Sequence, residues 1–336
     1  MNVSELTEAE LIARIRSRLP PAPHWVAVGI GDDAAVVEPA RNRQEVLTVD
    51  ALVEGIHFDR AFTPPAAIGH RALAVNLSDL AAMGAEPRLA LVSLALPAAL
   101  PCTDFDAMID GLTALAARHR VQVVGGNLTR SPGPLVVDVT VSGAVKRRQA
   151  LRRAGARAGD AVYVTGSLGA AAAGLQMLRA NGATTKATER HGPAASISER
   201  CVRRYLYPEP RVRSGMLLSR NRAASACMDL SDGLADAVTQ VAAASGVGIR
   251  VDEEALPIDP DVRAWFTARG EDPIVAALTG GDDYELLFTG HPKRARRLQS
   301  IGATITKIGV CTAEPAVTIR YNSDEKPMPR GYSHFA

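Results

Sequence analysis

Gly29-Ile30-Gly31-Asp32-Asp33 combines two glycines with two adjacent carboxylates. The glycines permit a tight turn, and the turn brings the two aspartate side chains close together. Because adjacent carboxylates repel each other, the stretch indicates a nearby cation, and oxygen ligands of this kind suit Mg²⁺. Glycine and aspartate are also ordinary turn residues, so this stretch taken alone favours a solvated turn over a metal site.

Similar combinations of glycine and acidic residues return twice in the second half of the chain. Asp229-Leu230-Ser231-Asp232-Gly233 follows a short apolar stretch, and Gly280-Gly281-Asp282-Asp283-Tyr284-Glu285 precedes another. The segment 64–83 is rich in Ala and Leu and is predicted to be a helix, with Asn76 and Asp79 on one face. Simpler explanations exist, since an aspartate can cap a helix and polar pairs on helices are often solvated. The recurrence of the pattern favours a site.

Strand and helix patterns alternate in both halves, which predicts an α/β or α+β fold. The length of 336 residues suggests two domains. We take the basic run 146–157 as their junction and expect domains at 1–148 and 149–336. The expected helices are 4–19, capped by Ser4, 64–83, 105–118, 166–179, 198–205, 212–220 and 232–244. The expected strands are 34–37, 46–49, 89–96, 121–124, 135–145, 161–165, 226–228, 249–251 and 286–288. The segment 181–195 is expected to be a loop.

Composition and motifs exclude several classes of protein. The net charge of +2 and the aromatic content of 4% argue against nucleic-acid binding. The longest apolar run, 89–96, is too short to cross a bilayer, and the N-terminus does not resemble a signal peptide. Four cysteines without C-x-x-C spacing indicate buried thiols in a reducing cytoplasm. P-loop, G-x-G-x-x-G and G-x-S-x-G motifs are absent from the sequence.

Taken in order, the motifs are specific to one family. The set consists of 29–33, Thr48-Val49-Asp50, Glu54-Gly55-Ile56-His57-Phe58, Asn76-Leu77-Ser78-Asp79 continuing to Gly84, 229–233 and 279–286. With this set the chain resembles, over nearly its whole length, the thiamine-monophosphate kinases of the PurM-like (aminoimidazole ribonucleotide synthetase-related) superfamily. The resemblance implies ATP-dependent phosphorylation of thiamine monophosphate, several Mg²⁺ ions, and a homodimer in which the sheets of the N-terminal domains pair.

The resemblance also assigns residues to the site. The implied metal ligands are Asp33, Thr48, Asp50, Asp79, Asn127, Asp229 and Asp232. The implied ATP contacts are Gly125, Gly126, Arg153 and Ser231. The implied contacts to thiamine monophosphate are His57, Asp282 and Tyr332, and the aromatic C-terminal stretch 331–335 is expected to be docked. No general base is expected, because a phosphate monoester with a second pKa of about 6 is already largely ionised at neutral pH.

Two positions depart from the family pattern. Asn127 stands where the family has aspartate, and Asp282 stands where it usually has glutamate. The alternatives are therefore another PurM-like ATP-dependent enzyme and a non-catalytic nucleotide-binding homologue weakened at Asn127. A selenophosphate synthetase would need a reactive cysteine near the N-terminus, whereas the first cysteine of this chain is Cys102. Amidine-forming relatives should lack the His57 and 280–285 stretches in this form.

Overall fold

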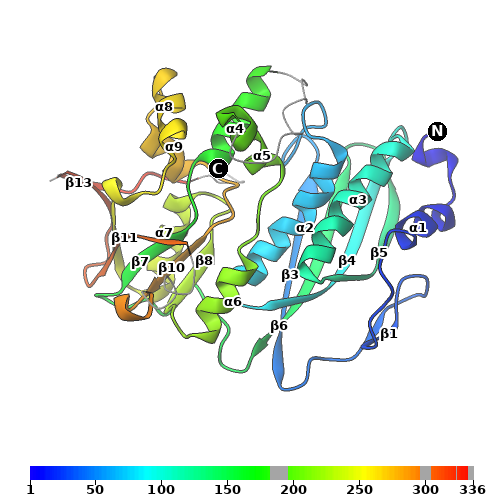
Figure 1. Ribbon diagram of the computed structural model, residues 1–336, viewed down its shortest axis with the longest axis horizontal. Helices are drawn as coiled ribbons and strands as arrows, with labels where there is room; N and C mark the ends of the chain where they lie inside the picture. The colour runs from blue at the N-terminus through cyan, green and yellow to red at the C-terminus, as the bar shows by residue number, and fades with distance from the viewer. Residues whose placement is uncertain (182–195, 296–303, 323, 332–336) are drawn as a thin grey trace. The chain divides into compact units, whose positions relative to one another are not determined.

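The computed structural model describes residues 1–181, 196–295, 304–322 and 324–331 (Figure 1). Its contacts divide the chain into two compact units. The first unit comprises Met1–Leu80 and Glu86–Arg147, and the second comprises Ala81–Ala85 and Arg148–Ala336. Both units contain a β-sheet and helices, which confirms the predicted α/β class.

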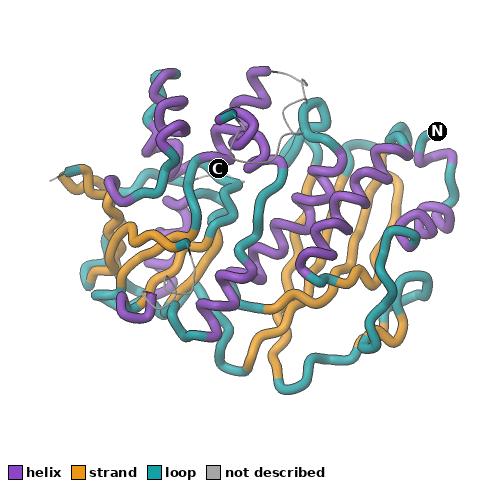
Figure 2. The backbone as a smooth tube through the Cα atoms, in the orientation of Figure 1, coloured by secondary structure: helices purple, strands orange, loops and turns teal. Residues whose placement is uncertain are grey.

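The first unit is a four-stranded sheet with two long helices on one face (Figures 1 and 2). The strand order is β3 (Arg43–Val53), β6 (Val136–Lys146), β4 (Glu86–Pro97) and β5 (Gln122–Ser131). β6 pairs antiparallel with β3 and β4, whereas β4 and β5 are parallel. The helices are α2 (Pro65–Ala82) and α3 (Cys102–His119).

Glycines bring α2 and α3 into close contact. A Cβ atom on Gly69 would lie 1.8 Å from the Met108 carbonyl oxygen, and one on Gly111 would lie 1.9 Å from that of Ala66. No side chain fits at either position, so the two helix backbones can approach each other only because both residues are glycine. The pair then covers the sheet as one layer, and Leu73, Leu77 and Phe105 are fully buried.

The register of the sheet separates two faces. Val139 on β6 pairs with Asp50 on one side and Val92 on the other, and this row points toward the helices, where Val139 is fully buried. The next row pairs Val49 with Thr140 and Thr140 with Leu91, and it points to the opposite face. On that face Leu47, Val49 and Leu91 are 70%, 58% and 40% exposed. The face of the sheet opposite α2 and α3, where Leu47, Val49 and Leu91 lie, will be called the open sheet face.

The N-terminal segment differs from the prediction of one helix over 4–19. A short 3₁₀ turn, η1 (Val3–Glu5), precedes α1 (Glu8–Arg16). The cap of α1 is Thr7, whose hydroxyl accepts a hydrogen bond from the Glu10 N–H at 3.3 Å, so the prediction of Ser4 as the cap is wrong. Thr7 is the favoured cap because the Glu10 side chain also accepts a hydrogen bond from the Thr7 N–H, which completes a capping box. Two short strands, β1 (Val26–Val28) and β2 (Val36–Val37), follow.

The second unit has a seven-stranded sheet in the order β13-β12-β9-β11-β7-β10-β8. Its strands are β7 (Ala161–Thr165), β8 (Ala226–Asp229), β9 (Gly248–Asp252), β10 (Leu286–Gly290), β11 (Ile305–Thr312), β12 (Val317–Tyr321) and β13 (Asp324–Pro327). Its helices are α4 (Ala170–Asn181), α5 (Ile197–Leu206), α6 (Val212–Arg220), α7 (Leu234–Ser245), α8 (Pro260–Ala268) and α9 (Pro273–Thr279), with the 3₁₀ turn η3 (Glu253–Ala255). In the middle of this sheet Tyr163 stacks on Phe288 with ring centroids 5.0 Å apart.

Most predicted elements are present, with shifted ends. β7 and α6 match the expected ranges, and α2 ends within one residue of the prediction. β5 was expected to end before Gly125, but it continues to Ser131 because its pairing with β4 extends to Pro97. The predictions for 182–195 and for Tyr332 fall outside the described residues. No helix in the described part of the chain is long and apolar enough to cross a membrane.

Candidate functional site

The first unit gathers two carboxylates and a hydroxyl beneath α2. The Thr48 hydroxyl donates a hydrogen bond to Asp79 Oδ2, and Asp50 is hydrogen-bonded to the same aspartate. Burial raises the pKa of Asp50 to about 6, and the negative charges of Asp79 and then Asp138 raise it in the same direction. Thr48, Asp50 and Asp79 will be called the acidic cluster.

The acidic cluster follows from strand and helix periodicity. Thr48 and Asp50 are two residues apart on β3 and point to the helix-covered face. Asp79 projects from α2 onto that face. Asn76, one turn earlier, is fully buried, which makes the alternative of a solvated edge wrong for this residue. Its side-chain N–H donates to the Ala72 carbonyl oxygen at 3.0 Å, and its Oδ1 atom is buried with no hydrogen-bond partner.

The donor set of the acidic cluster suits a hard divalent cation. Two carboxylates in contact repel each other, and the charge of Asp79 adds to burial, the larger cause, in raising the pKa of Asp50. A cation would favour the ionised form of both groups. Among the described residues no group of three or more His, Cys, Asp or Glu side chains is arranged to hold a metal ion. Two carboxylates and one hydroxyl would leave further positions around Mg²⁺ to oxygen atoms from water or a substrate, which Mg²⁺ usually retains.

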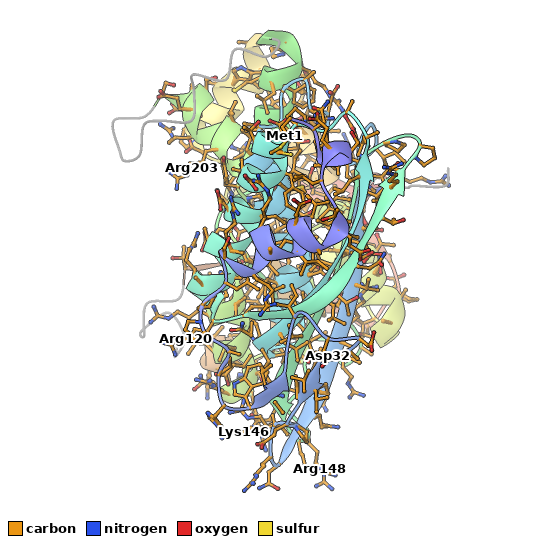
Figure 3. All side chains as sticks on the ribbon, turned by 90° about the vertical axis from the view of Figure 1, so that its right-hand side faces the viewer. Met1, Asp32, Arg120, Lys146, Arg148 and Arg203 are labelled. Carbon is orange, nitrogen blue, oxygen red and sulfur yellow. The ribbon has the colours of Figure 1, made fainter. Side chains whose placement is uncertain are left out.

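Asp33 lies apart from regular structure. It sits in the exposed turn between β1 and β2, where its N–H donates to Asp32 Oδ1 at 2.9 Å. Asp32 is likewise exposed at the surface of the first unit (Figure 3). The predicted turn at these two aspartates is therefore present, and the metal-binding role of Asp33 stays a prediction.

Gly125, Gly126 and Asn127 lie inside β5, next to β4. A Cβ atom on Gly126 would lie 1.8 Å from the Val92 carbonyl oxygen, so close packing of the two strands requires glycine there. Asn127 pairs with Ser93, which pairs in turn with Asp138 of β6. This row points to the open sheet face, whereas Asp50 points to the helices, so Asn127 belongs to a different row from the acidic cluster.

Asp138 is an acidic residue that the sequence analysis did not select. It is half-buried in β6 and contributes to the raised pKa of Asp50. The sequence contained a signal for this residue: Asp138 is the only charged residue in the otherwise uncharged stretch 135–141, which is predicted to be a strand.

His57 lies in the turn that ends β3. Its Nδ1 atom accepts a hydrogen bond from the Val53 N–H at 3.0 Å, and its own backbone N–H donates to the Val53 carbonyl oxygen at 2.9 Å. Because Nδ1 is the acceptor, the proton of a neutral His57 is on Nε2. The ring is thus held by the turn, with a defined donor nitrogen.

In the second unit, backbone hydrogen bonds join the two loops that carry the remaining acidic residues. The Asp282 N–H donates to the Ser231 carbonyl oxygen at 2.8 Å, and the Tyr284 N–H donates to that of Leu230 at 3.0 Å. The loops 229–233 and 280–285 therefore lie side by side: Ser231 and Asp232 lie next to Gly281 and Asp282, and Asp229 pairs with Leu286. The cap of α7 is Gly233 with a φ of 93°, so the alternative of Asp232 as a helix cap is wrong.

Arg153 and the last described residue both lie against α7. Arg153 donates to the Gln240 side chain at 2.6 Å, and Gln240 donates to Asp236 at 2.6 Å. A Cβ atom on Gly331 would lie 2.8 Å from the Cβ of Asp236 and 3.3 Å from the Asp232 carbonyl oxygen. The chain therefore passes the start of α7 at Gly331, next to one of the predicted metal ligands.

The chain matches known proteins over nearly its whole length. Family models for the N-terminal and C-terminal domains of AIR synthase related proteins match residues 31–145 and 157–322. The thiamine-monophosphate kinase of Bacillus subtilis (strain 168) is 36% identical over 322 residues, covering 92% of this chain and 94% of the relative.

Solved structures agree with the sequence matches. The thiamine-monophosphate kinase of Stenotrophomonas maltophilia K279a is 39% identical with a TM-score of 0.81, covering 94% of this chain and 96% of that one. AaThiL complexed with AMPPCP and TMP is 33% identical with a TM-score of 0.77, covering 100% and 99% of the two chains. Family models, sequence relatives and fold thus lead to one conclusion: the chain belongs to the thiamine-monophosphate kinase family of AIR synthase related proteins.

Proposed function

We propose that this protein transfers the γ-phosphate of ATP to thiamine monophosphate, giving thiamine diphosphate and ADP. The observation that carries the proposal is the acidic cluster of Thr48, Asp50 and Asp79, in a chain whose relatives are named for this reaction. One of the related structures holds AMPPCP and TMP together.

Mg²⁺ is the proposed metal. Several ions are proposed. Thr48, Asp50 and Asp79 would hold metal on the helix-covered face of the sheet. Asp33 and Asn127 are proposed ligands elsewhere in the first unit, and Asp229 and Asp232 are proposed ligands in the second. When bound, Mg²⁺ would neutralise charge on the phosphate groups, which otherwise repel one another. The chain's own part is to hold two oxygen donors of Asp50 and Asp79 in contact before any ligand arrives, so that binding requires little rearrangement.

The remaining residues would bind and orient the two substrates. Gly125, Gly126, Arg153 and Ser231 are proposed to contact ATP, with the glycines leaving the backbone accessible. His57, Asp282 and Tyr332 are proposed to contact thiamine monophosphate. His57 would offer its Nε2 proton to a phosphate oxygen, and a carboxylate at Asp282 suits the cationic thiamine rings. No side chain need act as a base, because the accepting phosphate oxygen is already ionised.

The proposal extends to assembly and location. Domain 1–148 would bind ATP and Mg²⁺ and form a homodimer, while 149–336 would supply the second set of ligands. The open sheet face supports a dimer, since Leu47 and Val49, at alternate positions of one strand and therefore on one face, are 70% and 58% exposed. All four cysteines are buried and unbridged, which is compatible with the cytoplasm.

The dimer is tested by equilibrium ultracentrifugation. The wild type should have twice the chain mass of 35.4 kDa, and Val49→Asp should reduce the measured mass to that of one chain.

The decisive experiment is turnover. Purified protein, ATP, Mg²⁺ and thiamine monophosphate should yield ADP and thiamine diphosphate in equal amounts, and chelation of Mg²⁺ should abolish the reaction. With a γ-phosphate made chiral, we expect inversion, because a direct in-line step needs no phospho-enzyme. A folded protein that binds ATP without turnover at any Mg²⁺ concentration would overturn the proposal in favour of a non-catalytic homologue.

A further inference from the structure

The loop that carries Asp282 has an unusual backbone. Asp282 and Tyr284 both have positive φ values, 66° and 48°, on either side of Asp283. Residues with a Cβ seldom adopt this left-handed conformation, and a bulky residue such as tyrosine does so rarely. A loop with this shape persists only where surrounding contacts determine it. The contacts around Asp282 therefore show what holds its carboxylate in place.

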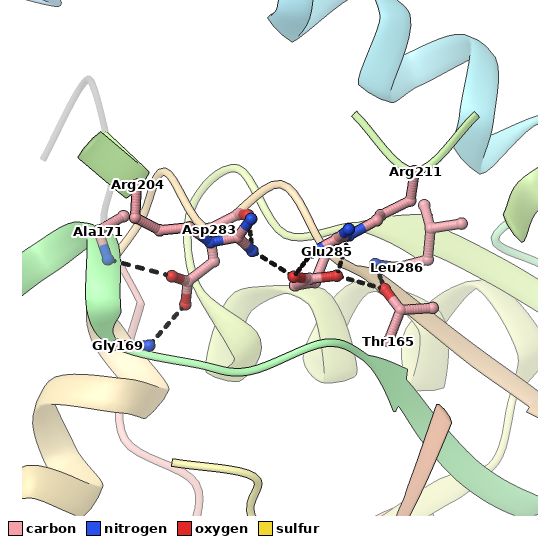
Figure 4. Close-up of polar contacts among 8 residues, drawn as sticks. All are labelled: Thr165, Gly169, Ala171, Arg204, Arg211, Asp283, Glu285 and Leu286. Atoms are coloured by element: carbon pink, nitrogen blue, oxygen red, sulfur yellow. Dashed lines mark hydrogen bonds and ion pairs between the residues drawn. The ribbon is translucent and has the colours of Figure 1, made fainter. Parts of the chain in front are cut away.

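The first set of contacts fixes Asp283. Its carboxylate accepts hydrogen bonds from the Gly169 N–H at 2.8 Å and the Ala171 N–H at 3.4 Å, at the start of α4 (Figure 4). Asp283 is 2% exposed, so its side chain points into the unit while Asp282 beside it is half-exposed.

The second set fixes the end of the loop at Glu285, which is fully buried. Arg211 binds the Glu285 carboxylate through two nitrogens, at 2.6 and 2.5 Å (Figure 4). Arg204 forms an ion pair with the same carboxylate and also donates to the Asp283 carbonyl oxygen at 3.2 Å. The Thr165 hydroxyl adds a further hydrogen bond at 2.6 Å. A bidentate arginine and a second guanidinium make this end of the loop rigid.

The third contact reaches Asp282 itself. The Tyr284 hydroxyl donates a hydrogen bond to Asp282 Oδ1 at 3.1 Å. Tyr284 is only 7% exposed, so its ring is packed and its hydroxyl has a defined position. The hydrogen bond fixes the direction of Oδ1 in a half-exposed carboxylate.

We propose that Tyr284 is a positioning residue for thiamine monophosphate: its hydroxyl aims the Asp282 carboxylate at the substrate, and the buried Arg204–Glu285–Arg211 pairs hold the loop in the conformation that makes this contact. The inference rests on the proposed function, because it takes Asp282 as a contact to thiamine monophosphate. Arg204, Arg211, Asp283 and Glu285 touch neither substrate in this account and act through Asp282.

A double-mutant cycle tests the inference directly. Tyr284→Phe should raise the KM for thiamine monophosphate about 3- to 10-fold, the range expected for one hydrogen bond to a charged group. The KM for ATP should stay within about twofold. In an Asp282→Ala background, the same Tyr284→Phe change should have no further effect, because the group it orients is gone. Tyr321→Phe removes a hydroxyl from the same unit and should change neither KM.

A second pair of variants tests the buried ion pairs. Arg204→Gln removes a guanidinium from the Asp282 loop, whereas Arg200→Gln, one turn earlier on α5, removes one that pairs with Asp261 at the surface. Assayed well below the melting temperature of each variant, Arg204→Gln should raise the KM for thiamine monophosphate selectively. Arg200→Gln should leave both KM values unchanged.

The outcomes separate this inference from the proposed function. Equal effects of Tyr284→Phe with and without Asp282, or equal changes in both KM values for Arg204→Gln, would overturn the inference and leave the kinase proposal intact. Wild-type protein that binds but does not phosphorylate thiamine monophosphate would overturn the kinase proposal. The same cycle measured by titration calorimetry, as Kd for thiamine monophosphate, would then still support or overturn the inference.

Discussion

One carboxylate in each unit lies next to other charged groups, and the charges next to the two carboxylates are of opposite sign: negative beside Asp50 and positive beside Glu285. In the first unit, the charges that raise the pKa of Asp50 are those of Asp79 and Asp138. In the second unit, Glu285 is fully buried and bound by two arginines. Carboxylates that crowd each other gain stability from a cation supplied by a ligand, whereas carboxylates paired with arginine are already satisfied. The comparison supports the proposed metal binding by the first arrangement and indicates a structural role for the second.

The largest expected effect is on turnover in the acidic cluster. Asp79→Asn and Asp50→Asn should each lower kcat/KM by about a hundredfold or more, because each removes charge from the groups that hold the metal. Neither should lower the melting temperature measured without metal, since each also removes a repulsion. The double variant should be little worse than either single one.

A surface carboxylate of the same unit provides the control. Asp110 is 58% exposed and pairs with Arg18, so Asp110→Asn should leave turnover unchanged. Full activity of Asp79→Asn at saturating Mg²⁺ would remove Asp79 from the site. A fall in melting temperature that parallels the loss of activity would make the acidic cluster structural, and the contrast between the units would disappear.

The next effect is on the stability of the second unit. Glu285→Gln leaves two guanidinium groups without their counter-charge and should cost about 3–5 kcal/mol of unfolding free energy in urea titrations. Glu271→Gln, which removes a 39% exposed partner of Arg269, should cost less than about 1 kcal/mol. If the two variants are equally stable, the buried arginine pairs do not support the loop.

A smaller effect concerns pH. Burial raises the pKa of Asp283 to about 7, against the opposing influence of Arg204 and of the Gly169 N–H. The folded state therefore binds this proton more tightly than the unfolded state, so the contribution of Asp283 to stability is greatest below its ordinary value near 4 and is lost as pH rises through 7. Relative to Asp283→Asn, the wild type should lose at most about 1.4 kcal/mol per pH unit between pH 5 and 7. Parallel stability profiles of the two proteins would show that Asp283 does not titrate in this range.

The smallest expected effect is at Asn127. Asn127→Asp adds a negative charge in the row of Asp138, next to but not within the acidic cluster. We expect the Mg²⁺ concentration for half-maximal rate to fall about two- to fivefold, because ligand charge strengthens binding of a hard cation. An unchanged Mg²⁺ dependence would mean that residue 127 is not a ligand in this chain.

Local elements were predictable because their signals are local. The apolar stripe of α2 and the glycine that follows it lie within one stretch, and the buried, largely apolar run of β7 lies within five residues. Predictions failed where distant contacts decide, as at β5, whose length is set by its pairing with β4. The sequence could not decide whether Asn76 is solvated or buried, because a helix pattern does not show how many faces of the helix are covered. In the folded unit Asn76 is fully buried.

What the sequence by itself determined is the order and spacing of the motifs, and with them the α/β class and the family, since these depend on residues close together in the chain. Only the tertiary structure decided which charged groups meet. Arg204, Arg211 and Glu285 come from three separate segments, and in the sequence each arginine resembles the solvated residues around it. Burial and charge pairing depend on distances in space between segments far apart in the chain, and no local pattern contains them.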